Sequence, residues 1–126
     1  MANALIGTLS AEIKTLLSLP YIADAPILIG AGNITHMKAR HPEDYAKYGA
    51  DIASIIMAPD YVGVSAKDHS IEYIKQYAVN VEYVKVAVRV SNSGVLFVRS
   101  LYVISETKIY NFIKSGTLKQ LSSRNP

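Results

Sequence analysis

The chain lacks cysteine and tryptophan altogether, and phenylalanine occurs only twice among its 126 residues. The absence of cysteine excludes disulfides, thiolate nucleophiles and cysteine-ligated zinc. No apolar run reaches the roughly eighteen residues that a transmembrane helix requires, so we predict no membrane span. The N-terminus also lacks the basic start and long apolar stretch of a signal peptide. These absences narrow the possible sites to ones built without thiol chemistry.

Half of the residues are hydrophobic, which is enough for a sizeable core. At this length we predict one domain that spans residues 1–126. The net charge is +3, and the basic excess lies in residues 105–126, which hold Lys108, Lys114, Lys119 and Arg124 against Glu106. This distribution fits a polyanionic partner, although many solubilising surfaces carry a similar charge.

The first half of the chain has helical periodicity. A short amphipathic helix is predicted from Thr8 to Leu17, and the apolar run Pro26–Ile29 predicts a buried strand. Asn33 can N-cap a helical turn. Pro42 suits the first position of the next helix, which we expect to continue to about Met57. The N-terminal part of the domain is therefore expected to be mainly helical.

After residue 60 the pattern changes to a period of two, which is typical of strands. A final helix is expected from Ser105 or Thr107 to Lys114. The sequence thus predicts an α+β fold, with helices packed on one face of a curved antiparallel sheet of about four strands. The four candidate strands are Tyr61–Val64, Ile71–Tyr77, Val81–Val90 and Val95–Ile104.

The last two strands form a hairpin whose register predicts a polar cluster. If Asn92 and Ser93 are the central turn residues, Lys85 pairs with Ser100, and Tyr83 pairs with Tyr102. One sheet face then carries Lys85, Arg89, Ser100 and Tyr102, flanked by Ala87 and Val98. The opposite face carries valines together with Phe97 and Leu101 for the core. A turn one residue longer would break this constellation.

The segment from His36 to His41 concentrates basic side chains, namely His36, Lys38, Arg40 and His41. Histidine can transfer protons near neutral pH, and cations can stabilise the charge that develops on a phosphorane. RNA brings its own nucleophile, the 2′-hydroxyl. On one continuous helix the two histidines lie about 140° apart, so they face one phosphate only if the helix breaks before Pro42. Alternatively, His41 merely caps the second helix and His36 is a surface residue.

Metal and cofactor chemistry find little support in the sequence. The carboxylates Glu43, Asp44, Asp51 and Asp60 do not form a convincing set of metal ligands. Glu43 and Asp44 are better explained as favourable charges at a helix N-terminus. We therefore predict a site without metal and without cofactor.

Four motifs resemble the phage and polymorphic-toxin branch of the barnase–EndoU–colicin–RelE-like nucleases. The motifs, spread over about residues 27–118, are His36-Met-Lys-Ala-Arg-His41-Pro42, Ile55-Ile-Met-Ala-Pro-Asp-Tyr-Val-Gly63, Val84-Lys-Val-Ala-Val-Arg-Val90 and Ser100-Leu-Tyr102. The resemblance implies a small α+β nuclease in which helices precede a four-stranded antiparallel sheet. It also implies metal-independent RNA cleavage that leaves a 2′,3′-cyclic phosphate.

By position, the resemblance implies that His36 and His41 match the family's helical histidine motif and that Lys85 matches its strand cation. Ser100 and Tyr102 match its Ser/Thr-x-aromatic motif. These five residues are the predicted catalytic set. The predicted substrate contacts come from Lys38, Arg40 and Arg89.

Members of this branch often serve as toxin modules, and some cut transfer RNA. The resemblance therefore implies an RNA substrate, an immunity or antitoxin protein as partner and a cytoplasmic site of action. Delivery would be by secretion or by phage, as part of a larger protein. Two other functions fit the same sequence: a non-catalytic RNA-binding module, and a structural phage domain whose exposed sheet is a protein interface.

Overall fold

The computed structural model describes residues 3–79, 81–91 and 94–121. The predicted turn centre, Asn92 and Ser93, lies outside the described residues. Within them, none of the helices has the length and apolar character needed to cross a membrane. The elements in chain order are β1 (Ala4–Thr8), α1 (Ala11–Leu17), β2 (Pro26–Ile29), α2 (Ala31–Arg40), α3 (Pro42–Tyr48), the 3-10 helix η1 (Gly49–Asp51), α4 (Ile52–Met57), β3 (Tyr61–Val64), β4 (Ile71–Tyr77), β5 (Glu82–Val90), β6 (Leu96–Ile104), α5 (Glu106–Lys114) and β7 (Leu118–Gln120).

The sheet in the described residues has seven strands in the order β1-β2-β6-β5-β4-β3-β7. Every neighbouring pair is antiparallel except β2 and β6, which are parallel. The α+β class is confirmed, but the prediction of about four antiparallel strands is wrong. The four predicted strands after residue 60 are present as β3–β6. The strand predicted at Pro26–Ile29 is present as β2 and belongs to the same sheet. The remaining strands, β1 and β7, have five and three residues, too few to show a clear period.

The N-terminal helix begins later than predicted. Ser10 is the N-cap of α1, and its hydroxyl accepts a hydrogen bond from the backbone N–H of Ile13 at 3.2 Å. Thr8, the expected first residue, ends β1 instead. The residues before α1 form β1, whose backbone N–H and C=O groups pair with those of β2. The spacing of apolar side chains that predicts a helix gives no sign of this backbone pairing.

The helix α2 begins before the predicted cap. Gly30 occupies its N-cap position, and the side-chain oxygen of Asn33 accepts a hydrogen bond from the Gly30 N–H at 2.8 Å. The single helix expected from Pro42 to Met57 is broken into α3, η1 and α4. The backbone leaves helical geometry at Tyr48, with φ −123° and ψ −2°, and again at Asp51, with φ −96° and ψ 2°. At Gly49 a Cβ atom would lie only 2.9 Å from the ring of Tyr45, so close packing of this ring requires a glycine there.

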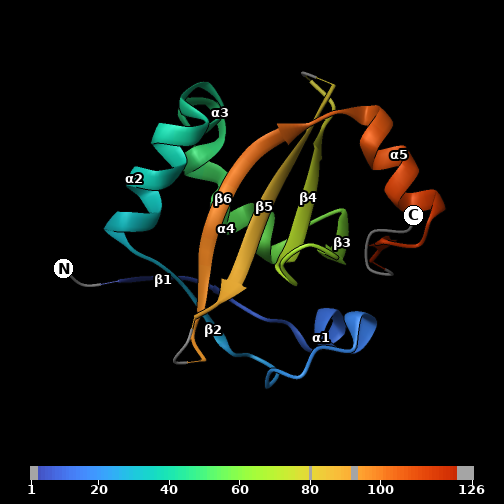
Figure 1. The fold of residues 1–126 in the computed structure, drawn as a ribbon, viewed down its shortest axis with the longest axis horizontal. Coiled ribbons are helices and arrows are strands. Elements are labelled where there is room, and N and C mark those ends of the chain that lie inside the picture. The colour runs from blue at the N-terminus through green and yellow to red at the C-terminus, as the bar shows by residue number, and fades with distance from the viewer. Residues whose placement is uncertain (1–2, 80, 92–93, 122–126) are drawn as a thin grey trace.

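The helices cover both faces of the sheet, which corrects the prediction that they pack on one face. The main core joins α1, α2, α3 and α4 to one face, through buried residues such as Met37, Ile55, Val86 and Leu101. A second, smaller core joins α5 to the other face through Ile74, Ile104, Ile109 and Leu118. Figure 1 shows α2 and α3 beside β6, with α5 towards the other side of the sheet near the C-terminus. We call the face that carries the main core the core face, and the other the open face.

The β5–β6 hairpin is displaced by two residues from the predicted register. Lys85 pairs with Tyr102 and Ala87 pairs with Ser100, in place of the expected Lys85–Ser100 and Tyr83–Tyr102 pairs. Because the displacement is an even number, Lys85, Ser100 and Tyr102 still share the open face.

A β-bulge follows in β6, where the pairing changes from Ala87–Ser100 to Val88–Val98. It leaves Arg99 as the extra residue and reverses the side-chain alternation beyond it. Phe97, expected in the core, therefore pairs with Arg89 on the open face. Val98, expected beside the polar cluster, is fully buried in the main core.

Candidate active site on the open face

The junction between α2 and α3 brings a histidine to the open face. His41 separates the two helices with φ −141° and ψ 69°, so the predicted break before Pro42 is present. The Asp44 carboxylate accepts a hydrogen bond from the Val103 N–H at 3.0 Å and so holds the start of α3 against β6. The His41 ring stacks on Tyr102, with 4.9 Å between centroids and 28° between planes. His41 occupies the N-cap position of α3, but its side chain makes no capping hydrogen bond.

A buried ion pair completes this cluster. The Lys85 ammonium lies 2.7 Å from a carboxylate oxygen of Glu72, and their side chains are 12% and 10% exposed. The same ammonium lies 5.0 Å from the centroid of the Tyr102 ring. Glu72, Lys85 and Tyr102 come from the adjacent strands β4, β5 and β6. We call these three residues and His41 the Lys85 cluster.

The electrostatic environment keeps the Lys85 side chain protonated. Burial lowers its pKa, but the hydrogen bond to Glu72 and the interaction with Tyr102 together outweigh that effect. The net result is a pKa raised above the ordinary value of 10.5. At neutral pH the cluster therefore holds a protonated amine, paired with the Glu72 carboxylate, against the Tyr102 ring on which His41 stacks.

Ser100 and Arg89 share the open face with the Lys85 cluster. Ser100 is half-buried, precedes Tyr102 by two residues along β6 and lies opposite Ala87. Arg89 forms an ion pair with Asp68 at 2.7 Å. This ion pair lowers the pKa of the Asp68 carboxyl far below its ordinary range, an effect that burial only partly offsets. Arg89 is thus already partnered and lies four residues from Lys85 along β5.

The remaining predicted residues lie on α2, outside the contacts of the Lys85 cluster. His36 and Arg40 are exposed on that helix. The Lys38 ammonium lies 5.6 Å from the centroid of the Tyr45 ring. It lines a surface pocket between α2 and α3 together with Pro42, Tyr45, Ala46, Gly49 and Ala50. Of the two histidines, only His41 contacts a predicted site residue within the described part of the chain.

Glu72 is the residue of this cluster that sequence reasoning missed. It lies between apolar residues in a strand whose positions Ile71, Tyr73 and Ile74 are fully buried. A carboxylate in such a run is rarely buried without a cation. This composition could have pointed to a buried partner such as Lys85, but strand pairing alone decides which cation reaches it.

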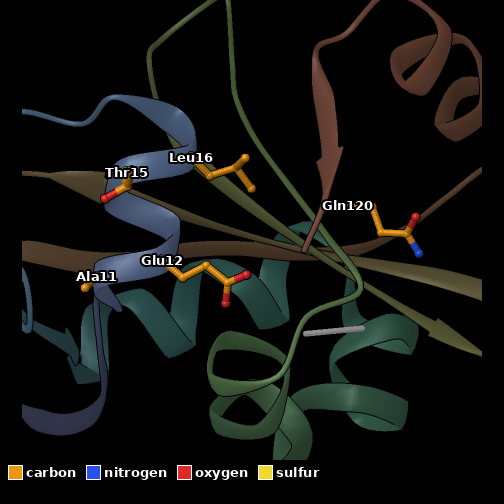
Figure 2. A pocket seen from close by; sticks show the side chains of 5 residues that line it. All are labelled: Ala11, Glu12, Thr15, Leu16 and Gln120. Carbon is orange, nitrogen blue, oxygen red and sulfur yellow. The ribbon is translucent and has the colours of Figure 1, made fainter. Parts of the chain in front are cut away.

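Other candidate sites are less suited to a polyanion. A hollow of 470 Å³ between α1 and β7 (Figure 2) is lined by Ala11, Glu12, Thr15, Leu16 and Gln120. Figure 2 shows Glu12 and Leu16 directed from the helix towards the strand that carries Gln120. Its charged lining residue is an acid, which repels phosphate. The described residues contain no group of three His, Asp or Glu side chains that could hold a metal ion.

Fold and site together define a small α+β domain whose open sheet face brings an imidazole and a protonated amine to the same tyrosine ring. The chain belongs to the phage-Barnase-EndoU-ColicinE5/D-RelE like nuclease family, since the family model described as phage-Barnase-EndoU-ColicinE5/D-RelE like nuclease3 matches residues 4–111. This match reaches further towards the N-terminus than the motifs that first indicated the resemblance. No curated protein and no solved structure matches the chain. The family assignment makes the protein a nuclease and gives it a nucleic-acid substrate.

Proposed function

We propose that this protein is a metal-independent endoribonuclease that cleaves RNA by attack of the 2′-hydroxyl on the neighbouring phosphate. The observation that carries the proposal is the contact of His41 and Lys85 with the same Tyr102 ring. A proton-transfer group and a protonated amine then act within one small area. RNA supplies its own nucleophile, so the site needs no protein nucleophile.

His41 is assigned the proton transfer. It accepts the proton of the 2′-hydroxyl as the new bond from the 2′-oxygen to phosphorus forms. The bond from phosphorus to the 5′-oxygen breaks, and the departing oxygen takes a proton from water or from the Tyr102 hydroxyl. The product carries a 2′,3′-cyclic phosphate. General acid–base catalysis of this kind contributes about 10²–10⁴-fold to the rate.

Lys85 is assigned the stabilisation of charge on the phosphorane. An ammonium has three N–H donors; Glu72 accepts one and the Tyr102 hydroxyl another, which leaves one to face a phosphate. Ser100 and Tyr102 lie on the same face and offer hydroxyls to the phosphate oxygens. Glu72 acts as a positioning residue, because its ion pair fixes the rotamer of Lys85 and keeps the amine charged.

His36, Lys38, Arg40 and Arg89 are assigned contacts with flanking RNA. Three of them are exposed along α2, next to the Lys85 cluster in the chain, and Arg89 continues the open face along β5. Positive side chains that follow an RNA backbone make binding sensitive to salt. Their loss is therefore expected to weaken substrate binding more than the chemical step.

The biological setting is proposed from the family. The nuclease acts as a toxin module on cytoplasmic RNA, with transfer RNA as a candidate target. It is delivered by secretion or by a phage as part of a larger protein. An immunity protein neutralises it in the producing cell.

The test is incubation of the purified chain with total RNA in excess EDTA, followed by a denaturing gel and end-group analysis. Discrete fragments that end in 2′,3′-cyclic phosphate are expected, and the Lys85→Gln variant should not produce them. Cleavage only after a divalent ion is added back would contradict the metal-independent mechanism. Intact RNA bound in a salt-sensitive manner would favour the non-catalytic RNA-binding module, and no RNA affinity at all would favour a protein-interaction domain.

A further inference from the structure

A small pocket lies on the hairpin beyond the Lys85 cluster. It has a volume of about 150 Å³ and is lined by Asn33, Arg89, Val90, Ser91, Phe97 and Arg99. We call it the Phe97 pocket. At about 3.3 Å per residue, Arg89 lies roughly 13 Å from Lys85 along β5. Pockets for drug-sized ligands occupy about 300–1,000 Å³, so this one has room for a single base-sized group.

The β-bulge at Arg99 places the Phe97 ring in the wall of the pocket. Regular alternation along β6 would put Phe97 in the core with Leu101. The bulge turns Phe97 to the open face, where it pairs with Arg89 and remains half-buried. A half-exposed aromatic ring on a sheet face is the platform on which single-stranded RNA bases stack.

The polar atoms that line the pocket are mainly hydrogen-bond donors. The Asn33 side-chain oxygen accepts from the Gly30 N–H, so its amide NH₂ remains available to the pocket. The Nε atom of Arg89 is buried and has no hydrogen-bond partner among the described residues. The exposed Arg99 guanidinium adds further donors. Because the pocket does not expose this buried N–H, a ligand acceptor reaches it only when the partly exposed Arg89 side chain shifts, and that contact would satisfy an otherwise unpaired donor.

The charge balance favours a base over a phosphate in this pocket. Asp68 already neutralises Arg89 through an ion pair of 2.7 Å. Arg99 is then the one lining cation without an acidic partner in the described part of the chain. A phosphate is bound best where several unpaired cations converge, whereas directed donors beside an aromatic ring suit the neutral acceptors of a base edge.

We propose that the Phe97 pocket binds a nucleobase of the RNA substrate, stacked on Phe97, with its acceptor edge towards Asn33, Arg89 and Arg99. Guanine fits these donors best, because its O6 and N7 acceptors lie side by side and can bind one guanidinium through two hydrogen bonds. The inference rests on the proposed ribonuclease function, because it gives that site a preference for RNA with guanine at a fixed distance from the cleaved bond.

The test measures binding without cleavage. The ¹⁵N-labelled chain is titrated by NMR with the 3′-monophosphates of guanosine, adenosine, cytidine and uridine, and with inorganic phosphate. We expect guanosine monophosphate to bind most tightly and to shift the amide signals of Asn33, Phe97 and Arg99. Phe97→Leu and Arg99→Gln should each weaken binding by about tenfold or more.

Two matched variants control for general loss of an aromatic ring or a charge. Phe112→Leu changes the other phenylalanine, which packs in the α5 core, and Lys119→Gln removes a charge from the exposed surface of β7. Both should bind guanosine monophosphate as the unmodified chain does. Equal affinity for all four nucleotides and for phosphate would overturn the base pocket.

A cleavage assay separates this inference from the proposed function. Selective guanosine binding without RNA cleavage would support the pocket and contradict the ribonuclease. RNA cleavage whose sequence preference is unchanged by Phe97→Leu and Arg99→Gln would support the ribonuclease and contradict the pocket.

Discussion

Two positions on the open face of β5, one near its middle and one near its C-terminal end, carry the same kind of interaction in different surroundings. Lys85 and Arg89 each form an ion pair of 2.7 Å with a carboxylate. The Lys85–Glu72 side chains are 12% and 10% exposed, whereas the Arg89–Asp68 side chains are 37% and 38% exposed. Glu72 belongs to the neighbouring strand β4, but Asp68 belongs to the loop before it.

This difference in burial means that one strand can hold one cation rigidly and leave another free to move. A buried pair is costly to break, because either charge alone is left desolvated. It therefore holds Lys85 in one place, as charge stabilisation requires. An exposed pair contributes little and exchanges readily with water, so Arg89 can adjust to a ligand. The predictions below test this division between chemistry at the Lys85 end and recognition at the Arg89 end.

The largest effect is expected at His41. The His41→Ala variant should lower kcat/KM for RNA cleavage by about 10²–10⁴-fold, because it removes the proton-transfer group at the Lys85 end. His36→Ala is the comparison variant: it should raise KM modestly and leave kcat close to that of the unmodified chain, since His36 is exposed and five residues away. Initial rates on one defined RNA measure both. Full cleavage by the folded His36→Ala/His41→Ala double variant would refute any histidine role.

The second prediction compares the stability of the two ion pairs. Lys85→Gln leaves Glu72 buried without its cation and should lower the free energy of unfolding by about 3–5 kcal/mol. Arg89→Gln leaves an exposed Asp68 and should cost about 1 kcal/mol or less. Urea unfolding followed by circular dichroism measures both values. Equal losses of unfolding free energy in the two variants would show that burial does not make the Lys85–Glu72 pair costlier to break than the Arg89–Asp68 pair.

The apolar double variant Lys85→Met/Glu72→Leu is a further check on that result. Replacing both partners removes the uncompensated charge, so much of the stability lost in Lys85→Gln should return. RNA cleavage should not return, because the cation is absent. Recovery of cleavage in this variant would remove Lys85 from the mechanism.

The third prediction concerns the pKa of Lys85. Glu72→Gln removes the carboxylate that raises this pKa, while burial still lowers it. The folded-state pKa should therefore fall, and the high-pH limb of kcat/KM should move to lower pH, because Lys85 must stay protonated. NMR titration of the lysine side-chain signals measures the shift directly. Asp68→Asn is the control and should leave both the titration and the limb unchanged.

The smallest effect is expected from the exposed pair in acid. The hydrogen bond that Asp68 accepts from Arg89 lowers the pKa of Asp68 below the unfolded value of about 3.9. The pair therefore stabilises the fold above that pH and loses its contribution as the pH falls towards the folded pKa. Asp68→Asn should reduce the acid-induced loss of stability by less than about 1 kcal/mol. Thermal unfolding at a series of acidic pH values measures this difference, and an identical acid dependence in both proteins would contradict it.

Much of the fold could be predicted from local patterns. The strands β3, β4, β5 and β6 and the last helix follow from alternation, Ser105 as N-cap and Gly116 beyond the helix end. The strands β1 and β7 could not be predicted in the same way, because five and three residues carry too short a pattern and their pairing partners are distant in sequence. Pro26–Ile29 was predicted as a strand, but its place between β1 and β6 was not. The apolar helical period after Pro42 also gave no sign of the loss of helical geometry at Tyr48.

Part of the candidate site could likewise be predicted from the sequence, and part could not. Its residue types, and the sharing of one face by Lys85, Ser100 and Tyr102, were available from the sequence because strand alternation has a period of two. The bulge that moves Phe97 out of the core was not available, since regular alternation predicts the opposite face for it.

Most of the helical and strand segments, the basic histidine motif and the nuclease family follow from the order of residue types along the chain. The stacking of His41 on Tyr102 and the pairs Glu72–Lys85 and Asp68–Arg89 depend on how the folded chain brings distant residues together. Local periodicity follows from backbone geometry, which each residue shares with its near neighbours. Contacts across strands depend on register, bulges and helix breaks, and these are set by packing the whole chain at once.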